Sequence, residues 1–187
     1  MTLEELTTRL NLLQPLPDET LPSNAYPAAV LLPLLPSEQG LELILTRRSK
    51  ALRHHPGQVC FPGGRADSSD VSLWHTALRE SFEEIGLLPE LCKPLAQLPA
   101  QHTISDFALT PFIGVIEGTP NFVLNPGEVT ALYKVPLSYA LDLHHHHVFK
   151  LRRKGRVHKV IFIRWQGIWI WGITAAIIHQ LSLQIAP

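Results

Sequence analysis

The chain has 187 residues, of which 45% are hydrophobic and 17% are charged, as in folded globular proteins rather than disordered ones. Lysine plus arginine equals aspartate plus glutamate at 16 each, so no net charge favours nucleic acid or an anionic membrane. The length predicts a single domain over residues 1–187, because domains usually run about 100–200 residues. We therefore expect any anionic substrate to be bound by local charges.

The N-terminal residues predict a helix and then an irregular lead-in up to residue 27. Leucines recur with helical spacing, and Thr2 and Glu5 have the spacing of a capping box. Prolines then exclude regular structure at Pro15, Pro17, Pro22 and Pro27. A signal peptide is not expected, because Glu4 and Glu5 stand where its basic segment belongs.

Cysteine usage and hydropathy both favour a cytoplasmic protein. Cys60 and Cys92 lie far apart and form no C-x-x-C pair, which argues against a disulfide framework or a zinc site. The apolar run Ile168–Ile178 has 11 residues, fewer than the roughly 18–20 needed to span a bilayer. We expect it to form a buried C-terminal helix with Trp169 and Trp171 packed at its entry, and we expect no membrane partner.

Short apolar runs predict a sheet with strands over residues 28–35, 41–46, 59–61, 95–98, 108–116 and 157–165. Helices are expected near residues 72–86, 137–143 and 173–184. The first of these begins near Ser72 and ends at Gly86, a residue suited to a left-handed C-cap. Its inward face is expected to contain Leu73, Ala77, Phe82 and Ile85. Mixed strands and helices predict an α/β layered sandwich.

Glu80, Glu83 and Glu84 lie on the helix predicted over residues 72–86 and project from one exposed face as i, i+3 and i+4 neighbours. Such an acidic cluster, seen alone, is usually a solvated helix face. Like charges so placed repel each other, and divalent cations would convert this repulsion into coordination by hard oxygen ligands. The spacing therefore favours a magnesium or manganese site.

Gly63 and Gly64 precede this helix, where glycines permit close approach of a ligand and free N–H groups attract phosphate. Together with the carboxylates, they suggest metal-assisted cleavage of a phosphoanhydride. The cations would neutralise the diphosphate and lower the pKa of an attacking water. Arg79, next to the first acid, is expected to orient the carboxylates.

Residues 64–87 resemble the Nudix box, Gly-x5-Glu-x7-Arg-Glu-U-x-Glu-Glu-x-Gly-U, in which U is aliphatic. The matching residues are Arg79, Glu80, Glu83, Glu84, Gly86 and Leu87. Asp70 stands where the first glutamate belongs, the interval to Arg79 is one residue longer, and Ser81 replaces an aliphatic residue. The resemblance implies an α/β/α sandwich with a mixed β-sheet.

Residues 45–64 are similar to the signature of the coenzyme A pyrophosphatase subgroup, Leu-Thr-x-Arg-Ser-x3-Arg-x3-Gly-x3-Phe-Pro-Gly-Gly, at every fixed position. Residues 125–129 and 171–175 also resemble bacterial NudL-type enzymes. The likeness implies hydrolysis of coenzyme A or its derivatives to 3′,5′-ADP and (acyl-)4′-phosphopantetheine with Mg²⁺ or Mn²⁺.

The resemblance also implies roles for individual residues. Glu80 and Glu84 carry over as metal ligands, and Glu83 is a further ligand or a general base acting through water. Glu128 is the alternative base, because it follows a turn and could reach the metals from another loop. Arg48 and Arg53 either bind the substrate phosphates or make surface ion pairs, and Gly63 and Gly64 are candidate substrate contacts.

Two other functions stay open: a Nudix hydrolase of another nucleoside diphosphate derivative such as ADP-ribose, and a coenzyme A sensor without catalysis. All three imply a small-molecule partner and no nucleic acid, and the oligomeric state is open, with a homodimer as one alternative. The four histidines His144–His147 are expected in a wet loop, because consecutive residues cannot share one face. The basic run Lys150–Lys159 is expected to be a solvated turn around Gly155.

Overall fold

The computed structural model describes residues 1–12, 21–153 and 156–185. The predicted N-terminal helix is confirmed as α1 (Leu3–Leu12). Its capping box is formed, because Thr2 Oγ1 accepts from the Glu5 N–H at 3.1 Å and Glu5 Oε2 accepts from the Thr2 N–H at 2.8 Å. Pro15, Pro17 and most of the expected lead-in lie outside the described residues.

The described strands form one sheet, and they are β1 (Tyr26–Ser37), β2 (Gly40–Arg48), β3 (Val59–Cys60), β4 (Gly63–Arg65), β5 (Cys92–Gln97), β6 (Gln101–His102), β7 (Phe107–Ile116), β8 (Val129–Pro136), β9 (His146–Arg153), β10 (Arg156–Trp165) and β11 (Ile168–Trp171). Their main order is β5-β7-β1-β2-β3-β11-β10-β9, with β4 beside β1, β6 beside β7 and β8 beside β2. The pairs β1–β7 and β11–β3 are parallel and the others are antiparallel. The predicted mixed α/β fold is therefore confirmed.

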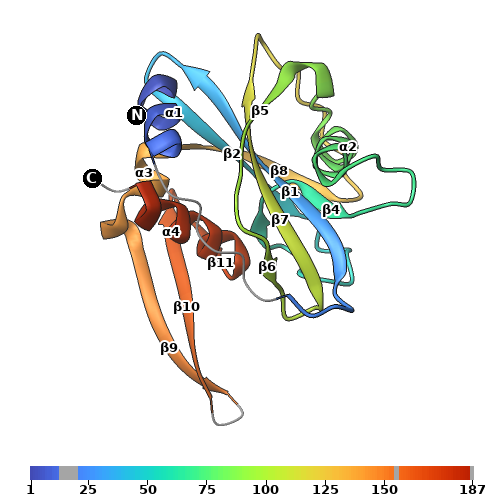
Figure 1. Cartoon of the computed structure of the whole chain (residues 1–187), viewed down its shortest axis with the longest axis vertical. Coiled ribbons are helices and arrows are strands. Elements are labelled where there is room, and N and C mark those ends of the chain that lie inside the picture. The colour runs from blue at the N-terminus through green and yellow to red at the C-terminus, as the bar shows by residue number, and fades with distance from the viewer. Residues whose placement is uncertain (13–20, 154–155, 186–187) are drawn as a thin grey trace.

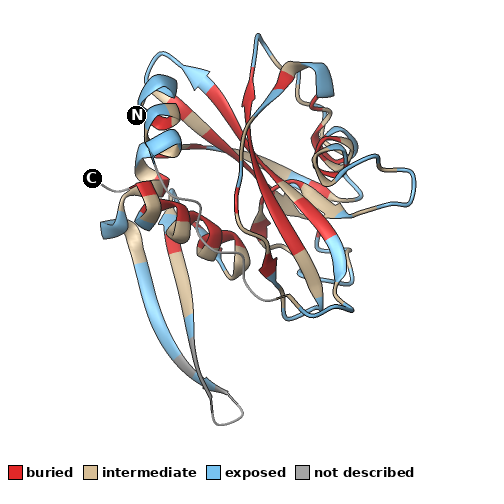
Figure 2. Cartoon of the chain, viewed as in Figure 1, coloured by how far each residue is buried: buried red, intermediate tan, exposed pale blue. Residues whose placement is uncertain are grey.

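Helices cover both faces of this sheet (Figure 1). Helix α2 (Leu73–Ile85) packs on one face, while α1, α3 (Leu137–Leu141) and α4 (Ile173–Ile185) pack on the other. Alternate residues of β2 serve the two layers, since Leu43 and Leu45 face α4 and Ile44 faces α2. Short 3-10 turns at Pro89–Leu91 and Leu143–His145 complete the described elements. Figure 2 shows the buried residues concentrated in the crossing strands and on the inward sides of α2 and α4.

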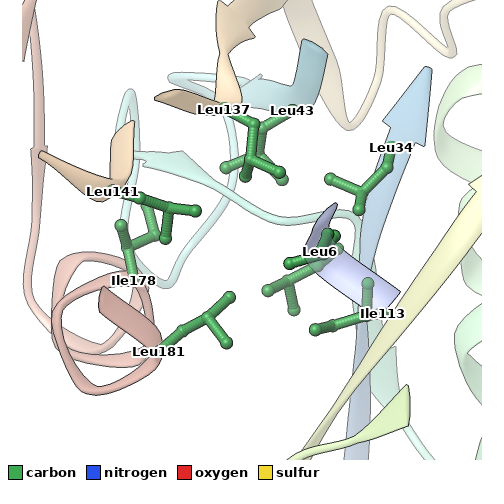
Figure 3. Close-up of a pocket in the computed structure, with 9 residues that line it drawn as sticks. Leu6, Leu34, Leu43, Ile113, Leu137, Leu141, Ile178 and Leu181 are labelled. Carbon is green, nitrogen blue, oxygen red and sulfur yellow. The ribbon is translucent and has the colours of Figure 1, made fainter. Parts of the chain in front are cut away.

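The layer on the α4 side is closely packed. Leucine and isoleucine side chains from α1, α3, α4 and the sheet enclose a cavity of about 10 Å³, too small for more than one water (Figure 3). Leu6 of α1 points into it, opposite Leu181 of α4. At the end of α4, Arg9 Nη1 donates to the Ile185 carbonyl oxygen at 2.7 Å. The two ends of the described chain are therefore joined in one apolar layer.

Strand β1 pairs with two different strands along one of its edges. Its first half pairs with β4 from Ala28↔Arg65 to Val30↔Gly63, and its last residues pair with β2 from Leu34↔Leu43. Between the two, the Leu31 N–H donates to the Pro62 carbonyl oxygen at 2.9 Å. The sheet thus forks at this edge, and the segment 49–62 runs between the end of β2 and the start of β4.

The prediction for the C-terminal apolar run was partly wrong. Residues 168–171 form β11, and the helix begins only after Gly172, whose φ is 67°. Ile168 and Ile170 are buried, whereas Trp169 and Trp171 are 48% and 41% exposed on the opposite side of the strand. The period is that of a strand, so the tryptophans do not pack at a helix entry. No helix among the described residues is long and apolar enough to cross a bilayer.

Strands β4, β6, β8 and β9 were not predicted, and β9 corrects the expectation of a wet loop at His144–His147. His144 and His145 belong to the 3-10 turn, while His146 and His147 start β9. The described residues of the basic run belong to the long β9–β10 hairpin, in which Lys150 pairs with Lys159, and this hairpin projects from the body in Figure 1. The turn expected at Gly155 lies outside the described residues.

Candidate active site

Helix α2 begins and ends where the sequence indicated. The Ser72 side chain accepts a hydrogen bond from the His75 N–H at 3.1 Å, which satisfies a free donor of the first turn. Gly86 ends the helix with a φ of 68°, a left-handed conformation that glycine adopts at little cost. The caps therefore fix the rotation and length of the helix that carries the acidic residues.

The inward face of α2 differs from the prediction at one residue. Ala77, Ser81 and Ile85 are fully buried, whereas Phe82 is 48% exposed. These buried residues follow i, i+4 and i+8 spacing, which turns Phe82 away from the sheet. Ser81 is accommodated in the interior because its hydroxyl donates to the Ala77 carbonyl oxygen at 2.7 Å.

Asp70 is the fixed partner of Arg79. Its carboxylate accepts from Nε and Nη2 of Arg79, both at 3.0 Å, and from the Thr76 hydroxyl at 2.9 Å. The hydrogen bonds from Arg79 hold the pKa of Asp70 well below its usual range, although its side chain is only 2% exposed. The sequence showed Asp70 only as a departure from the motif, and its role needed the fold.

Arg79 joins the first two acids of the motif. Its Nη1 lies 2.9 Å from Glu80 Oε1 and 3.2 Å from Glu83 Oε2. With Nε and Nη2 bound to Asp70, the guanidinium cannot rotate freely, so it sets the positions of both carboxylates. Arg79 therefore lies between Asp70 on one side and Glu80 and Glu83 on the other, and its orienting role stays a prediction.

Glu84 is buried rather than exposed, which corrects the expectation that all three acids project from one exposed face. The residue is 2% exposed, and its Oε1 lies 3.9 Å from Nη1 of Arg48. Burial raises the pKa of the Glu84 carboxyl to about 8, and the Arg48 guanidinium opposes that rise. Its Oε2 is buried without a hydrogen-bond partner. Such an atom is costly unless a ligand or ion reaches it.

The two glycines lie in β4 and not at the start of α2, which corrects the expectation of a phosphate cradle at the helix N-terminus. A Cβ on Gly64 would come within 2.5 Å of the Glu80 carboxylate. Gly63 has a φ of 147°, and a Cβ there would meet the Ala29 carbonyl oxygen at 2.4 Å. Glycine is needed at both positions, at Gly64 because an acidic side chain approaches the backbone.

Glu128 reaches the acidic cluster from the loop before β8. Asn125 links this loop to α2, since its N–H donates to the Glu84 carbonyl oxygen at 3.0 Å. The Asn125 side chain also donates to Glu128 Oε1 at 3.2 Å. Burial raises the pKa of Glu80 and Glu84, and the negative charge of Glu128 raises both further. Asn125 was missed by sequence reasoning, although its Asn-Pro-Gly turn was visible.

The two predicted arginines lie at different distances from these acids. Arg48 is at the end of β2 and faces Glu84, while its Nε donates to the His54 carbonyl oxygen at 3.4 Å. Arg53 is exposed in the loop that follows. That loop starts beside Glu128, because the Ser49 N–H donates to the Glu128 carbonyl oxygen at 2.6 Å. The structure therefore brings Arg48 to the acids and leaves Arg53 at the surface.

Residues 25–157, more than half of the chain, match the family model for the NUDIX domain. The chain belongs to the Nudix hydrolase family. Its relatives include two proteins named "Uncharacterized Nudix hydrolase NudL". That of Enterobacter sp. (strain 638) is 40% identical over 185 residues, covering 99% of this chain and 95% of the relative. That of Pectobacterium atrosepticum is 44% identical over 159 residues, covering 85% and 82%.

Solved structures share the fold of this Nudix hydrolase. The Nudix hydrolase RenU from M. Smegmatis has a TM-score of 0.53 and 24% identity over 63% of this chain and 74% of its own. An Ap4A hydrolase of C. elegans has a TM-score of 0.52 and 18% identity over 59% and 80%. At these identities the likeness concerns the fold alone. As a Nudix hydrolase, the protein acts on nucleoside diphosphate derivatives.

Nudix hydrolases generally use divalent cations, and the donors of this one fit such ions. Glu80, Glu83 and Glu84 offer hard carboxylate oxygens, and Oε2 of Glu84 has no partner. Within the described part of the chain, no three acidic, histidine or cysteine side chains are gathered into a ready metal cage. Arg79 binds Glu80 and Glu83, and Arg48 faces Glu84. The two guanidinium groups therefore lie at the same carboxylates whose negative charge divalent cations would neutralise.

Proposed function

We propose that this Nudix hydrolase cleaves the diphosphate of coenzyme A or its derivatives, giving 3′,5′-ADP and (acyl-)4′-phosphopantetheine with Mg²⁺ or Mn²⁺. The observation that carries the proposal is the contact between its two motifs. Arg48, from the segment similar to the coenzyme A signature, lies 3.9 Å from Glu84 of the Nudix box. A substrate bound by the segment 45–64 would therefore have its diphosphate beside the acidic cluster.

Glu80, Glu84 and Glu83 are the residues that would hold the cations. When bound, the cations supply charge neutralisation of the diphosphate and lower the pKa of the attacking water. Arg79 keeps Glu80 and Glu83 in position through its own bonds to Asp70. Arg48 and Arg53 bind substrate phosphates, and Gly63 and Gly64 are further candidate substrate contacts through the backbone beside Glu80.

The reaction is a displacement at phosphorus by water. The water oxygen forms a bond to one phosphorus, the bridging P–O bond breaks, and the bridging oxygen leaves with the other phosphate. One proton of the water passes to a carboxylate, for which Glu83 and Glu128 are the two candidates. Glu83 is half exposed and paired with Arg79, while Glu128 is held by Asn125 beside Glu80 and Glu84.

We also propose that residues 1–187 act as one domain. Helices α1 and α4 come from opposite ends of the chain and pack into the same core, with Arg9 bonded to the Ile185 carbonyl oxygen. The sheet they cover also carries Arg48 and the glycines. Removal of either helix is therefore expected to expose the core below the site.

A substrate panel tests the proposed reaction. Purified protein is incubated with Mg²⁺ or Mn²⁺ and with coenzyme A, acetyl-coenzyme A, ADP-ribose or a dinucleoside polyphosphate, and the products are identified by mass spectrometry. We expect 3′,5′-ADP and 4′-phosphopantetheine, with the highest kcat/KM for a coenzyme A form. Equal or better turnover of ADP-ribose would overturn the substrate assignment and favour the alternative among Nudix hydrolases.

Calorimetry separates an enzyme from a sensor. Coenzyme A is titrated into the protein with Mg²⁺ under the conditions of the assay. Tight binding without product would favour the sensor, whereas binding followed by the heat of hydrolysis supports the enzyme.

A further inference from the structure

One row of side chains crosses the sheet from the acidic site to the β10–β11 hairpin. The Arg48 N–H donates to the Gln58 carbonyl oxygen at 2.9 Å, and Arg47 pairs with Val59. Val59 in turn pairs with Ile170 in a parallel register, so the preceding residues, Gln58 and Trp169, lie at one level.

The next strand continues this row. Trp169 of β11 is paired directly with Arg164 of β10. Ile170 and Ile163, their neighbours in the next pair, are buried under α4, so Trp169 and Arg164 lie on the opposite face, the face of α2. The row on this face is therefore Arg48, Gln58, Trp169 and Arg164. Three strand spacings separate its ends, about 14 Å.

Trp169 and Arg164 of this row, with Trp171 beside them, form an exposed surface that we call the aromatic shelf. Trp169 is 48% exposed, and the Arg164 guanidinium lies over its ring, 5.6 Å from the ring centroid. Trp171, beside it, is 41% exposed and stacks at 6.4 Å from Phe162 of β10. Exposed aromatic rings in a row with a cation are typical of surfaces that stack a flat ligand ring.

Arg164 also lines an open hollow of about 460 Å³ at the far end of the row, together with Tyr139, His144, His145 and His147. Asp142 borders the same region, and its carboxylate is paired with His144 at 2.8 Å and His145 at 3.9 Å. The sequence contains no aspartate or glutamate after Asp142. Asp142 thus takes up two of the histidines, and Arg164 is the residue of this region that offers a permanent positive charge to an anion.

We infer that this shelf binds the nucleoside 3′-phosphate half of the substrate, with the purine base on Trp169 and the 3′-phosphate at the Arg164 guanidinium beside it. The inference rests on the proposed function, and it gives the substrate a direction across the sheet. The diphosphate lies at Arg48 and the acids, the adenosine part extends toward β10, and the pantetheine arm leaves in another direction. Because the 3′-phosphate and the diphosphate are attached to the same ribose, the side chains of Arg48 and Arg164 have to reach toward each other over the intervening strands.

The test compares coenzyme A with dephospho-coenzyme A, which lacks only the 3′-phosphate. For Arg164→Gln we expect kcat/KM to fall about tenfold on coenzyme A, the effect of one charge-assisted hydrogen bond. On dephospho-coenzyme A we expect a loss of no more than about twofold, because only the contact with Trp169 is removed. Lys159→Gln is the matched control, since Lys159 is exposed on β10 but on its other face. It is expected to leave both substrates unchanged.

A binding measurement adds a readout that does not depend on turnover. Calorimetry with 3′,5′-ADP and with 5′-AMP should show tighter binding of 3′,5′-ADP, and Arg164→Gln should abolish that preference. Trp169→Ala should weaken both ligands, and Trp169→Phe should restore most of the affinity, because a stacking ring is retained. Circular dichroism checks that each variant is folded.

The outcomes separate this inference from the proposed function. Wild-type protein that does not hydrolyse coenzyme A at all would contradict the proposed function. Normal hydrolysis, with Arg164→Gln reducing coenzyme A and dephospho-coenzyme A equally, would overturn the shelf alone. A loss in Trp169→Ala that grows with the length of the acyl chain would assign the shelf to the pantetheine half and would also overturn the inference.

Discussion

Replacing Asp70 by asparagine tests how much the contact between Asp70 and Arg79 stabilises the acidic site. The Asp70 carboxylate is 2% exposed and accepts two hydrogen bonds from Arg79, both at 3.0 Å. Asparagine keeps the shape but loses the charge, and its NH2 group would face a donor. Hydrogen bonds to charged groups contribute about 1.5–3 kcal/mol, while breaking a fully buried ion pair costs about 3–5 kcal/mol.

The expected loss of unfolding free energy lies near the lower of these two ranges. Arg79 is 23% exposed and keeps Glu80 and Glu83 as partners, so its charge is not left isolated. We therefore expect Asp70→Asn to lose about 2–3 kcal/mol of unfolding free energy at pH 7. For a chain of this size, that loss corresponds to a fall in Tm of roughly 4–12 °C. Activity should fall as well, because Arg79 positions two acids.

The direction in which pH changes this stability difference follows from the pKa of Asp70. The folded-state pKa of Asp70 is lowered by its bonds to Arg79, so its stabilising effect is complete above the unfolded pKa and is lost as pH falls through the folded pKa. Urea unfolding of both proteins from pH 7 to pH 2 should show the difference in stability shrinking in acid. Asp67→Asn is the control, because Asp67 is exposed and bonds only within its own turn. An unchanged urea midpoint for Asp70→Asn at pH 7 would refute the reasoning.

Four further substitutions test the acids and the glycine beside Glu80. Glu84→Gln should keep the fold, because glutamine is uncharged and of equal size. It should lower kcat about 100-fold or more in a metal-dependent assay. Near-normal turnover would show that Glu84 is not a metal ligand. Comparing the pH–rate profiles of Glu83→Gln and Glu128→Gln should identify the base as the one whose loss removes the acid limb, and two unchanged profiles would exclude both. Gly64→Ala should displace Glu80 and reduce kcat/KM about tenfold or more with little change in Tm, whereas unchanged kinetics would show that the close approach is unimportant.

Local signals made helix α2 and its caps predictable. Ser72 and Gly86 act through hydrogen bonds and backbone angles within a few residues, so their effect can be read from the sequence. The acidic motif was visible for the same reason. The burial of Glu84 was not, because it depends on Arg48 of β2 and on the β4 backbone, which are distant in sequence and come together only when the sheet forms.

The other errors arose where one apolar run serves two elements. Residues 168–178 read as one helix, yet Gly172 separates a strand of alternating isoleucine and tryptophan from α4. A period of two over four residues is a weak signal beside seven further apolar or small residues. The positions of Trp169 and Arg164 on the α2 face follow from strand pairing, which no local pattern indicates.

The fork at the edge of β1 determines which segment of the chain can change without disturbing the sheet. The loop of residues 49–57 is closed at its base by the Arg48 and Gly57 backbone bonds, and the strand that follows is anchored by the bond between Leu31 and Pro62. Its two ends are therefore held by the sheet, whatever sequence lies between them. Lengthening such a surface loop costs little free energy, about 0.6 kcal/mol for each doubling. Under the proposed function, the substrate-binding loop can therefore change in sequence or length without displacing the acidic helix or the core beneath it.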